Sequence, residues 1–323
     1  MPLTFDLPLE ALKQYKGVNP RPMDFDAFWD NGIKEMRSLD AQVEMIPAEF
    51  QVAGVECYDM YFRGVGGARI HCKLLRPASI TEPCPLILMF HGYSCDSSDW
   101  SNKLGYVAQG FIVAAMDCRG QGGLSEDPGG VQGNTLNGHI VRGLTDALAG
   151  NPQKLLFQQI FLDTAQLAGI MMEMPEVDEE RVYATGASQG GGLTVACAAL
   201  EPRIKRAAPV YPFLSDYQRV WEMDYAKDAY TELKEYFRHF DPQHKKEEAI
   251  FEQLGYIDIQ HLAERIQAKV LWSIGLMDTV CPPSTQYAAF NKVKSQKKMA
   301  IFPDFRHEEL PGLNDQIMLF FLD

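Results

Sequence analysis

Residues 185–192 read TGASQGGG, a stretch in which one serine stands among four glycines and which directly follows the run RVYA. Residues 191–200, GGLTVACAAL, have a helical pattern, so the region predicts a strand, a sharp turn and a helix. In that context Gly186-x-Ser188-x-Gly190 is typical of a nucleophile elbow, where the serine backbone is strained and only small neighbours fit. The alternatives are a glycine-rich turn with a bystander serine, or a phosphate-binding loop, although no lysine follows the glycines.

Short apolar runs on both sides of the elbow indicate the fold class. They cover residues 85–90, 111–116, 206–210, 270–274 and 299–302, and helical segments separate them. Such runs are typical of parallel strands that helices cover on both faces. We therefore predict an α/β fold, in which residues 58–63 and 70–75 add a hairpin around GVGG.

The domain organisation follows from the same pattern. No repeat or linker divides the chain, so we predict a single domain over residues 1–323. Residues 1–55 form a helical N-terminal extension in this interpretation. Residues of about 213–262 are polar and aromatic and lack a strand run, which predicts a helical insertion that could wall an active site.

The composition excludes several classes of partner. The formal net charge is −13, whereas nucleic acids and anionic membranes are bound by clustered Lys and Arg. No stretch is long enough to span a membrane, and the N-terminus lacks the basic and apolar regions of a signal peptide. The seven cysteines form no C-x-x-C pair, which indicates free thiols and no zinc site. We therefore expect a cytoplasmic protein with no nucleic-acid or membrane partner.

A general base for Ser188 can be selected by its position. Hydrolases of this architecture supply their acid and base after the serine, in the order Ser, Asp or Glu, His. Only His307 follows the last predicted strand, in a loop before the final helix. The other histidines precede the serine or fall in the insertion: His71, His91, His139, His239, His244 and His261. His307 is therefore the candidate base, with an ordinary surface histidine as the alternative.

The candidate acid is Asp278, in the loop after the strand that follows the insertion. The sequence there, VLWSIGLMDTVCPP, continues into a helix start at Pro282-Pro283. The alternative is a structural role, in which Asp278 only caps a helix or a turn. Asp304, three residues before His307, is the chief competitor, but chain order favours Asp278.

Two backbone N–H groups are the candidate oxyanion donors. One belongs to Gln189, the residue after the serine, as this kind of elbow requires. The second is expected from Tyr93 in FHGYSCDSSDW, where Gly92 lets the chain turn sharply after a strand. The alternative is that His91-Gly92 only ends that strand.

Three motifs together resemble the acetyl xylan esterase and cephalosporin C deacetylase family, carbohydrate esterase family seven. They are RGQG at 119–122, GASQGG at 186–191 and HE at 307–308, and they occur in the family's order. The blocks RPMDFDAFW, MFHGY, YPFLSDY and GLMDTVCPPST extend the resemblance over almost the whole chain.

The resemblance implies an α/β-hydrolase with Ser188, Asp278 and His307 as its catalytic triad and Tyr93 and Gln189 as oxyanion donors. It also implies removal of acetyl groups from small sugars and from esters such as cephalosporin C, in an intracellular homo-hexamer whose sites face an inner cavity. The remaining motif residues would support the loops: Arg119, Gly120, Gln121, Gly186, Gly190 and Glu308. The segment 136–155 carries no landmark, so the sequence gives it no function.

The expected reaction is acyl transfer through an acetyl-enzyme, which needs no metal or organic cofactor. Three other functions fit parts of the pattern. A broader carboxylesterase would accept longer acyl chains. A peptidase of the same fold usually carries a large gating domain, and fewer than a hundred residues precede the oxyanion strand. A catalytically silent scaffold would have no physical reason to keep nucleophile, base, acid and donors together.

Overall fold

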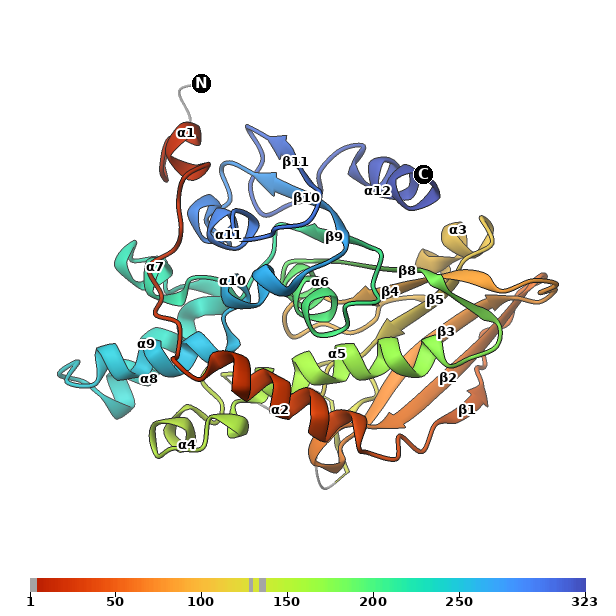
Figure 1. Cartoon of the computed structure of the whole chain (residues 1–323), viewed down its shortest axis with the longest axis horizontal. Helices are drawn as coiled ribbons and strands as arrows, with labels where there is room; N and C mark the ends of the chain where they lie inside the picture. Colours follow the sequence, from red (N-terminus) through yellow and green to blue (C-terminus); the bar gives the residue numbers. More distant parts are fainter. Residues whose placement is uncertain (1–4, 128–129, 134–137) are drawn as a thin grey trace.

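The computed structural model describes residues 5–127, 130–133 and 138–323. Its main feature is a nine-stranded sheet with the order β1-β2-β3-β5-β4-β8-β9-β10-β11 (Figure 1). A separate pair of two-residue strands, β6 (Glu126–Asp127) and β7 (Val131–Gln132), lies outside that sheet. The candidate residues are distributed over loops that follow strands of the main sheet.

Six neighbouring strands of the main sheet run parallel to one another. They are β5 (Ile112–Met116), β4 (Cys84–Phe90), β8 (Val177–Ala187), β9 (Arg206–Val210), β10 (Lys269–Gly275) and β11 (Lys297–Phe302). Each apolar run predicted to be a parallel strand lies in one of these strands, with shifts at the ends, and the predicted α/β fold class is confirmed. Because parallel strands end at one edge of a sheet, the loops after β4, β8, β10 and β11 meet there.

The other three strands are antiparallel and include one that the sequence did not indicate. The expected hairpin is formed by β2 (Val55–Arg63) and β3 (Arg69–Pro77). At the sheet edge β1 (Glu44–Pro47) pairs with β2, so the predicted helical extension also contributes a strand. This strand is short and mostly exposed, which leaves it without the apolar alternation that would predict it.

Helices cover both faces of the sheet. On one face the buried helix α5 (Leu156–Met172) lies beside α2 (Phe25–Arg37), where Trp29 stacks on Phe161 with ring centroids 5.9 Å apart (Figure 1). The elbow helix α6 (Gln189–Leu200) packs against α5 on this face. On the other face Phe321 of α12 (Leu313–Leu322) stacks on Tyr183 of β8 at 5.2 Å, and α3 (Leu104–Val107) packs against β5.

Residues 213–262, between β9 and β10, hold four α-helices and no strand. These are α7 (Tyr217–Glu222), α8 (Thr231–Phe240), α9 (Glu247–Leu254) and α10 (Ile259–Leu262). The helices α7, α8 and α9 lie with α4 (Leu144–Leu148) beyond the ends of the central strands, at the left of Figure 1, and α10 packs against α6. The remaining helices are α1 (Leu9–Leu12) and α11 (Pro283–Phe290).

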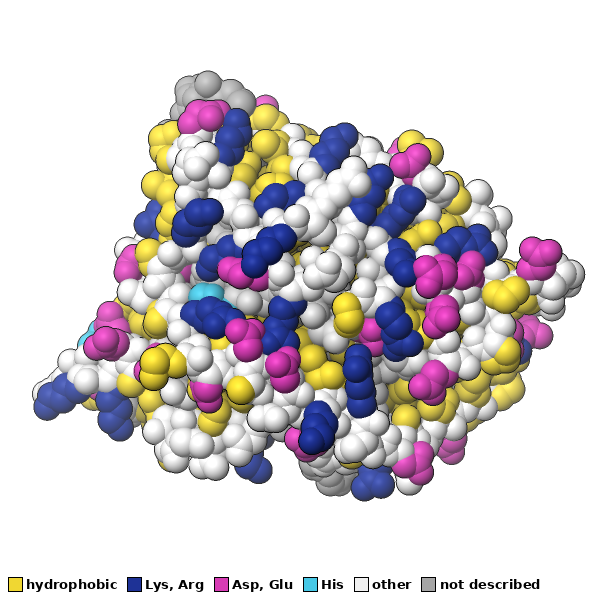
Figure 2. All heavy atoms as spheres, in the orientation of Figure 1, with side chains coloured by type: hydrophobic (Ala, Val, Ile, Leu, Met, Phe, Trp, Pro, Cys, Tyr) yellow, Lys and Arg dark blue, Asp and Glu magenta, His cyan; other side chains and the backbone are white. Residues whose placement is uncertain are grey.

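The distribution of charged side chains on the surface and the state of the cysteines agree with what the composition indicates. On the face shown in Figure 2, Lys and Arg are interspersed with Asp and Glu rather than gathered in one block. In the described ranges, no helix is both long and apolar enough to cross a membrane. All seven cysteines are free.

Candidate active site

The elbow is formed where β8 ends at Ala187 and α6 begins at Gln189. Ser188 lies between them with φ 58° and ψ −119°, a conformation that L-residues rarely adopt. Added Cβ atoms at Gly186 and Gly190 would lie 2.5 Å and 2.1 Å from the carbonyl oxygen of Phe90 on β4. Because that backbone cannot move away, these two positions require glycine, and the serine hydroxyl is presented at the end of the sheet.

The structure brings the predicted nucleophile, base and acid into one hydrogen-bonded chain. The Nε2 atom of His307 lies 2.9 Å from Ser188 Oγ, and its Nδ1 atom lies 2.8 Å from Asp278 Oδ2. The Asp278 side chain is fully buried, and its carboxylate accepts the Nδ1–H of His307, which fixes that tautomer. Nε2 is then free to accept the serine proton.

The acid loop holds Asp278 in place. Its Oδ1 atom accepts the backbone N–H groups of Val280 and Cys281 at 2.9 and 2.8 Å. The competitor Asp304 is exposed, and the partner of the His307 Nδ1–H is Asp278 instead. The Tyr211 ring lies against the imidazole with a centroid distance of 4.6 Å.

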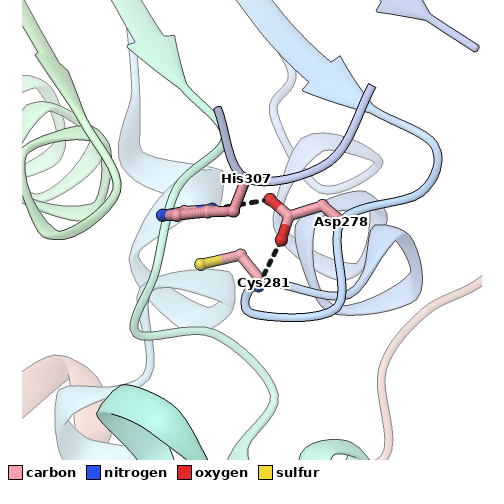
Figure 3. A group of neighbouring side chains, drawn as sticks. All are labelled: Asp278, Cys281 and His307. Carbon is pink, nitrogen blue, oxygen red and sulfur yellow. Dashed lines mark hydrogen bonds and ion pairs between the residues drawn. The ribbon is translucent and has the colours of Figure 1, made fainter. Parts of the chain in front are cut away.

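One group of side chains has the composition of a metal site. Ligand atoms of Asp278, Cys281 and His307 lie within 4.8 Å of one another (Figure 3). Three N–H donors already occupy the carboxylate, because His307 donates to Oδ2 and two backbone groups donate to Oδ1. Burial, and then the nearby Asp278 charge, raises the pKa of the Cys281 thiol well above its usual value, which disfavours the thiolate that a metal needs. The chemistry of this donor set fits a proton relay better than a metal.

The two candidate oxyanion donors stand on adjacent segments that Gln121 connects. Its Oε1 atom accepts the N–H of Ser94, the residue after Tyr93, at 2.9 Å. Its side-chain amide also exchanges hydrogen bonds with the Gln189 amide at 2.8 and 3.0 Å. Within the described part of the chain, the backbone N–H groups of Tyr93 and Gln189 donate to no protein acceptor. Both donors are therefore available to a ligand.

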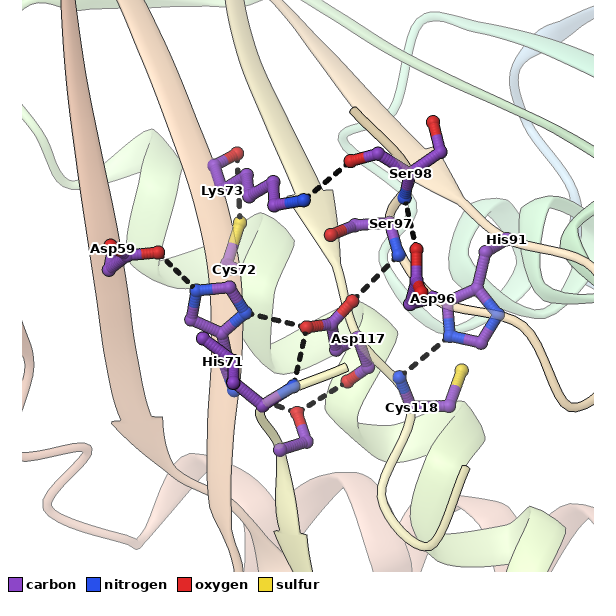
Figure 4. Close-up of polar contacts among 12 residues, drawn as sticks. Asp59, His71, Cys72, Lys73, His91, Asp96, Ser97, Ser98, Asp117 and Cys118 are labelled. Atoms are coloured by element: carbon purple, nitrogen blue, oxygen red, sulfur yellow. Dashed lines mark hydrogen bonds and ion pairs between the residues drawn. The ribbon is translucent and has the colours of Figure 1, made fainter. Parts of the chain in front are cut away.

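The loop that carries Tyr93 rests on the loop after β5. The N–H of Cys118 donates to His91 Nε2 at 2.9 Å, and the N–H of Ser97 donates to Asp117 Oδ1 at 2.7 Å (Figure 4). His71 contacts Asp117 at 2.6 Å and Asp59 at 2.8 Å through its two ring nitrogens. His71 therefore links Asp59 on β2 to Asp117 in the loop after β5.

The charge of Asp117 is stabilised by these contacts. Burial raises the pKa of this carboxyl, but the His71 hydrogen bond and charge, with the N–H groups of Leu124 and Ser97, outweigh burial and lower the pKa to about 2. The carboxylate therefore stays ionised at neutral pH and holds the loop.

The other motif residues lie around these loops. Arg119 is buried and makes a bidentate ion pair with Asp163 of α5, at 2.7 and 2.8 Å. Gly120 has φ 70°, which explains why glycine stands there. Glu308 is exposed and accepts the backbone N–H of Arg306 at 2.9 Å, next to His307.

Sequence reasoning missed Glu232, on α8 of the insertion. This carboxyl group is buried and accepts a hydrogen bond from the Tyr93 hydroxyl, and burial raises its pKa to about 7. It also contacts the backbone of Ile140 and Val141, within the segment 136–155 that carried no landmark. Residues 136 and 137 lie outside the described residues. No pattern in the sequence connects positions this far apart.

A hollow of about 370 Å³ adjoins the elbow. It is lined by Gly186 and Ala187, which precede Ser188, by residues of the Tyr93 loop, and by the polar side chains of Asp96 and Asn102. A larger hollow of about 690 Å³ lies between α12 and the strands β10 and β11, away from Ser188. The hollow beside the elbow is therefore the nearer of the two to Ser188 in sequence, although Ser188 and His307 line neither of them.

Comparison with known proteins places this geometry in one family. A family model described as acetyl xylan esterase (AXE1) matches residues 1–323. The chain is 56% identical to the solved structure of acetyl xylan esterase 1 from Thermoanaerobacterium sp. JW/SL YS485, with a TM-score of 0.94 over 98% of this chain and 99% of that one. An acetyl xylan esterase from Paenibacillus sp. R4 is 32% identical, with a TM-score of 0.88 over the same shares of the two chains.

A curated relative is more distant. The acetyl esterase Axe7A of Xylanibacter ruminicola is 25% identical over 304 residues. The match covers 92% of this chain and spans 65% of the length of that relative.

Proposed function

The chain belongs to the acetyl xylan esterase family, and from this premise we propose that it is a serine esterase that removes acetyl groups from small acetylated sugars. The substrates would include xylo-oligosaccharides and related acetyl esters such as cephalosporin C. The observation that carries the proposal is the hydrogen-bonded chain from Ser188 through His307 to Asp278 at the elbow. The similar proteins named as acetyl xylan esterases support acetyl as the acyl group.

The acylation half of the reaction starts at Ser188. His307 Nε2 accepts the proton of Ser188 Oγ while the oxygen attacks the acetyl carbonyl carbon. The carbonyl oxygen becomes an anion that the N–H groups of Tyr93 and Gln189 stabilise. The intermediate then collapses, the C–O bond to the sugar breaks, and the sugar oxygen takes the proton from His307. The product of this half is an acetyl-enzyme and a free sugar hydroxyl.

Deacylation repeats the sequence with water. His307 takes a proton from water, whose oxygen attacks the acetyl carbon, and the same two N–H groups bind the new oxyanion. Collapse breaks the bond to Ser188 Oγ, which recovers its proton from His307, and acetate leaves. Asp278 stays ionised throughout and stabilises the imidazolium that forms in both halves. These steps use side chains and backbone of this chain alone.

The acyl group is the feature that separates this proposal from a broader carboxylesterase. We expect kcat/KM for p-nitrophenyl esters to fall at least about tenfold from acetate to butyrate and further to octanoate, because each poorly fitting methylene costs roughly 1–3 kcal/mol. Initial rates of the wild type, corrected for the rate of Ser188→Ala, measure this. Rates that hold or rise with chain length would assign a general carboxylesterase instead.

We also infer from the family resemblance that the protein is an intracellular homo-hexamer. Free thiols support a reducing compartment, and the exposed Leu319 and Leu322 of α12 offer apolar surface to a neighbour. Mass photometry of protein recovered from the lysate of producing cells is expected to give a hexamer mass. A monomer or dimer under these conditions, or recovery only from the culture medium, would contradict the inference.

A further inference from the structure

Glu232 is a buried carboxylate that the reaction described above does not use. It lies on α8, in the helical insertion, and is 6% exposed. Its Oε1 atom accepts the hydroxyl proton of Tyr93, and its Oε2 atom accepts the N–H groups of Ile140 and Val141 at 2.7 and 3.2 Å. Three hydrogen-bond donors, from the Tyr93 loop and from residues 140–141, therefore converge on one side chain of a third segment, α8.

The Tyr93 ring is held on several sides. It makes T-shaped contacts with the rings of His139 and Phe213, with centroids 4.9 and 5.4 Å away and interplanar angles of 68° and 74°. The Tyr93 hydroxyl, besides donating to Glu232, accepts the N–H of His139 at 3.3 Å. The hydroxyl is the point at which the ring connects to α8.

The backbone beside Tyr93 is constrained as well. Ser94 has φ 58°, and its hydroxyl lies 3.1 Å from His139 Nε2. The Tyr93 N–H belongs to the Gly92–Tyr93 peptide, which is bonded to the Cα atom that carries the ring. On the other side of that Cα atom, the N–H of Ser94 is held by Gln121 Oε1 at 2.9 Å. A shift of the ring would therefore move the backbone donor.

We propose that Glu232 is a positioning residue for the oxyanion hole, which holds the Tyr93 hydroxyl and thereby keeps the Tyr93 backbone N–H aimed at the reacting carbonyl. The insertion is then part of the catalytic apparatus as well as a wall of the site. This inference rests on the proposed function, because it takes Tyr93 as the second oxyanion donor.

The carboxylate of a glutamate suits this position better than the isosteric amide of a glutamine. Above its pKa of about 7 the glutamate is ionised and accepts at both oxygens, so it then satisfies all three donors. A glutamine has one acceptor oxygen, and its amide nitrogen would face either the Tyr93 hydroxyl or the two backbone N–H groups. Glu232→Gln therefore leaves at least one donor without an acceptor while it changes the size of the side chain little.

A double-mutant cycle between Glu232→Gln and Tyr93→Phe tests the proposal. Tyr93→Phe keeps the ring and the backbone N–H and removes the hydroxyl that Glu232 holds. Each single variant is expected to lower kcat on p-nitrophenyl acetate roughly ten- to hundredfold with KM within about twofold, because a misplaced oxyanion donor acts in the transition state. The double variant should be no slower than the slower single variant. Glu235→Gln, an exposed glutamate on the same helix, is the matched control and should keep wild-type kinetics.

A second readout separates positioning from general support of the fold. A trifluoromethyl ketone forms an oxyanion adduct with the serine, so its inhibition constant should rise in proportion to the loss of kcat. Effects of the two substitutions that multiply, a change in KM alone, or wild-type inhibition by the ketone would overturn the proposal. Thermal unfolding shows whether Glu232→Gln is folded. If it is not, Tyr93→Phe alone tests the proposal, and an unchanged kcat in that variant would overturn it.

The same experiment distinguishes this inference from the proposed function. A wild type without activity on acetate esters, or a Ser188→Ala variant that keeps that activity, would refute the esterase itself. An active wild type beside an unimpaired Glu232→Gln would refute only the role of Glu232.

Discussion

Ser188→Ala is expected to lower kcat on p-nitrophenyl acetate by about 10⁴-fold or more, with only the contribution of the oxyanion donors left. The reason is that His307 Nε2 is hydrogen-bonded to Ser188 Oγ, and the acetyl group would be transferred to this oxygen. Alanine has no oxygen that could give a proton to His307 or form an ester with the acetyl group. Initial rates at saturating ester measure the loss.

The control for this variant is Ser38→Ala, an exposed serine after α2, which should keep wild-type rates. A serine-directed phosphonate adds an independent readout. It should label the wild type and Ser38→Ala and leave Ser188→Ala unlabelled. A wild type that resists labelling would support a catalytically silent scaffold, whereas substantial esterase activity in Ser188→Ala would refute the mechanism.

Asp278→Asn is expected to lower kcat by about 10⁴-fold, a loss close to that of the nucleophile. In the structure Asp278 accepts three N–H donors, from His307, Val280 and Cys281. An asparagine can keep its oxygen on the backbone donors only by turning its NH₂ group toward His307 Nδ1. The imidazole would then carry its proton on Nε2, where it cannot accept the serine proton.

Asp304→Asn is the matched control for this loss, because it makes the same chemical change three residues before His307. The Asp304 side chain is exposed, so this variant should retain wild-type kcat. A pH–rate profile of both variants shows whether the imidazole still titrates in the wild-type range. A larger loss of activity in Asp304→Asn than in Asp278→Asn would identify Asp304 as the acid instead.

Much of the fold could be predicted because buried parallel strands have a simple sequence pattern. Strands such as β4 and β5 are covered on both faces, so they read as continuous apolar runs. The elbow is equally visible, since close contacts with the Phe90 carbonyl demand glycine two residues before and two residues after Ser188. The edge strand β1 was missed because an exposed strand of four residues carries no such pattern.

The candidate site could be predicted where chain order restricts the choice. His307 and Asp278 follow from their positions after particular strands, and the structure brings both to Ser188. The support of the loops could not be predicted in the same way. Arg119 meets Asp163 44 residues later, and Tyr93 meets Glu232 139 residues later. Such pairs depend on how helices pack on the sheet. In addition, a buried glutamate in a polar helical segment cannot be distinguished from a solvent-exposed glutamate by its sequence context.

Ser188 is expected to carry the acetyl group of a small sugar ester during turnover. The most direct test is to mix the wild type with acetylated xylobiose, quench with acid within the first turnovers and identify the acetylated peptide by mass spectrometry. We predict an acetyl group on Ser188 that disappears as the substrate is exhausted. Release of acetate without any acetyl group on Ser188, or with the acetyl group on another residue, would contradict the account.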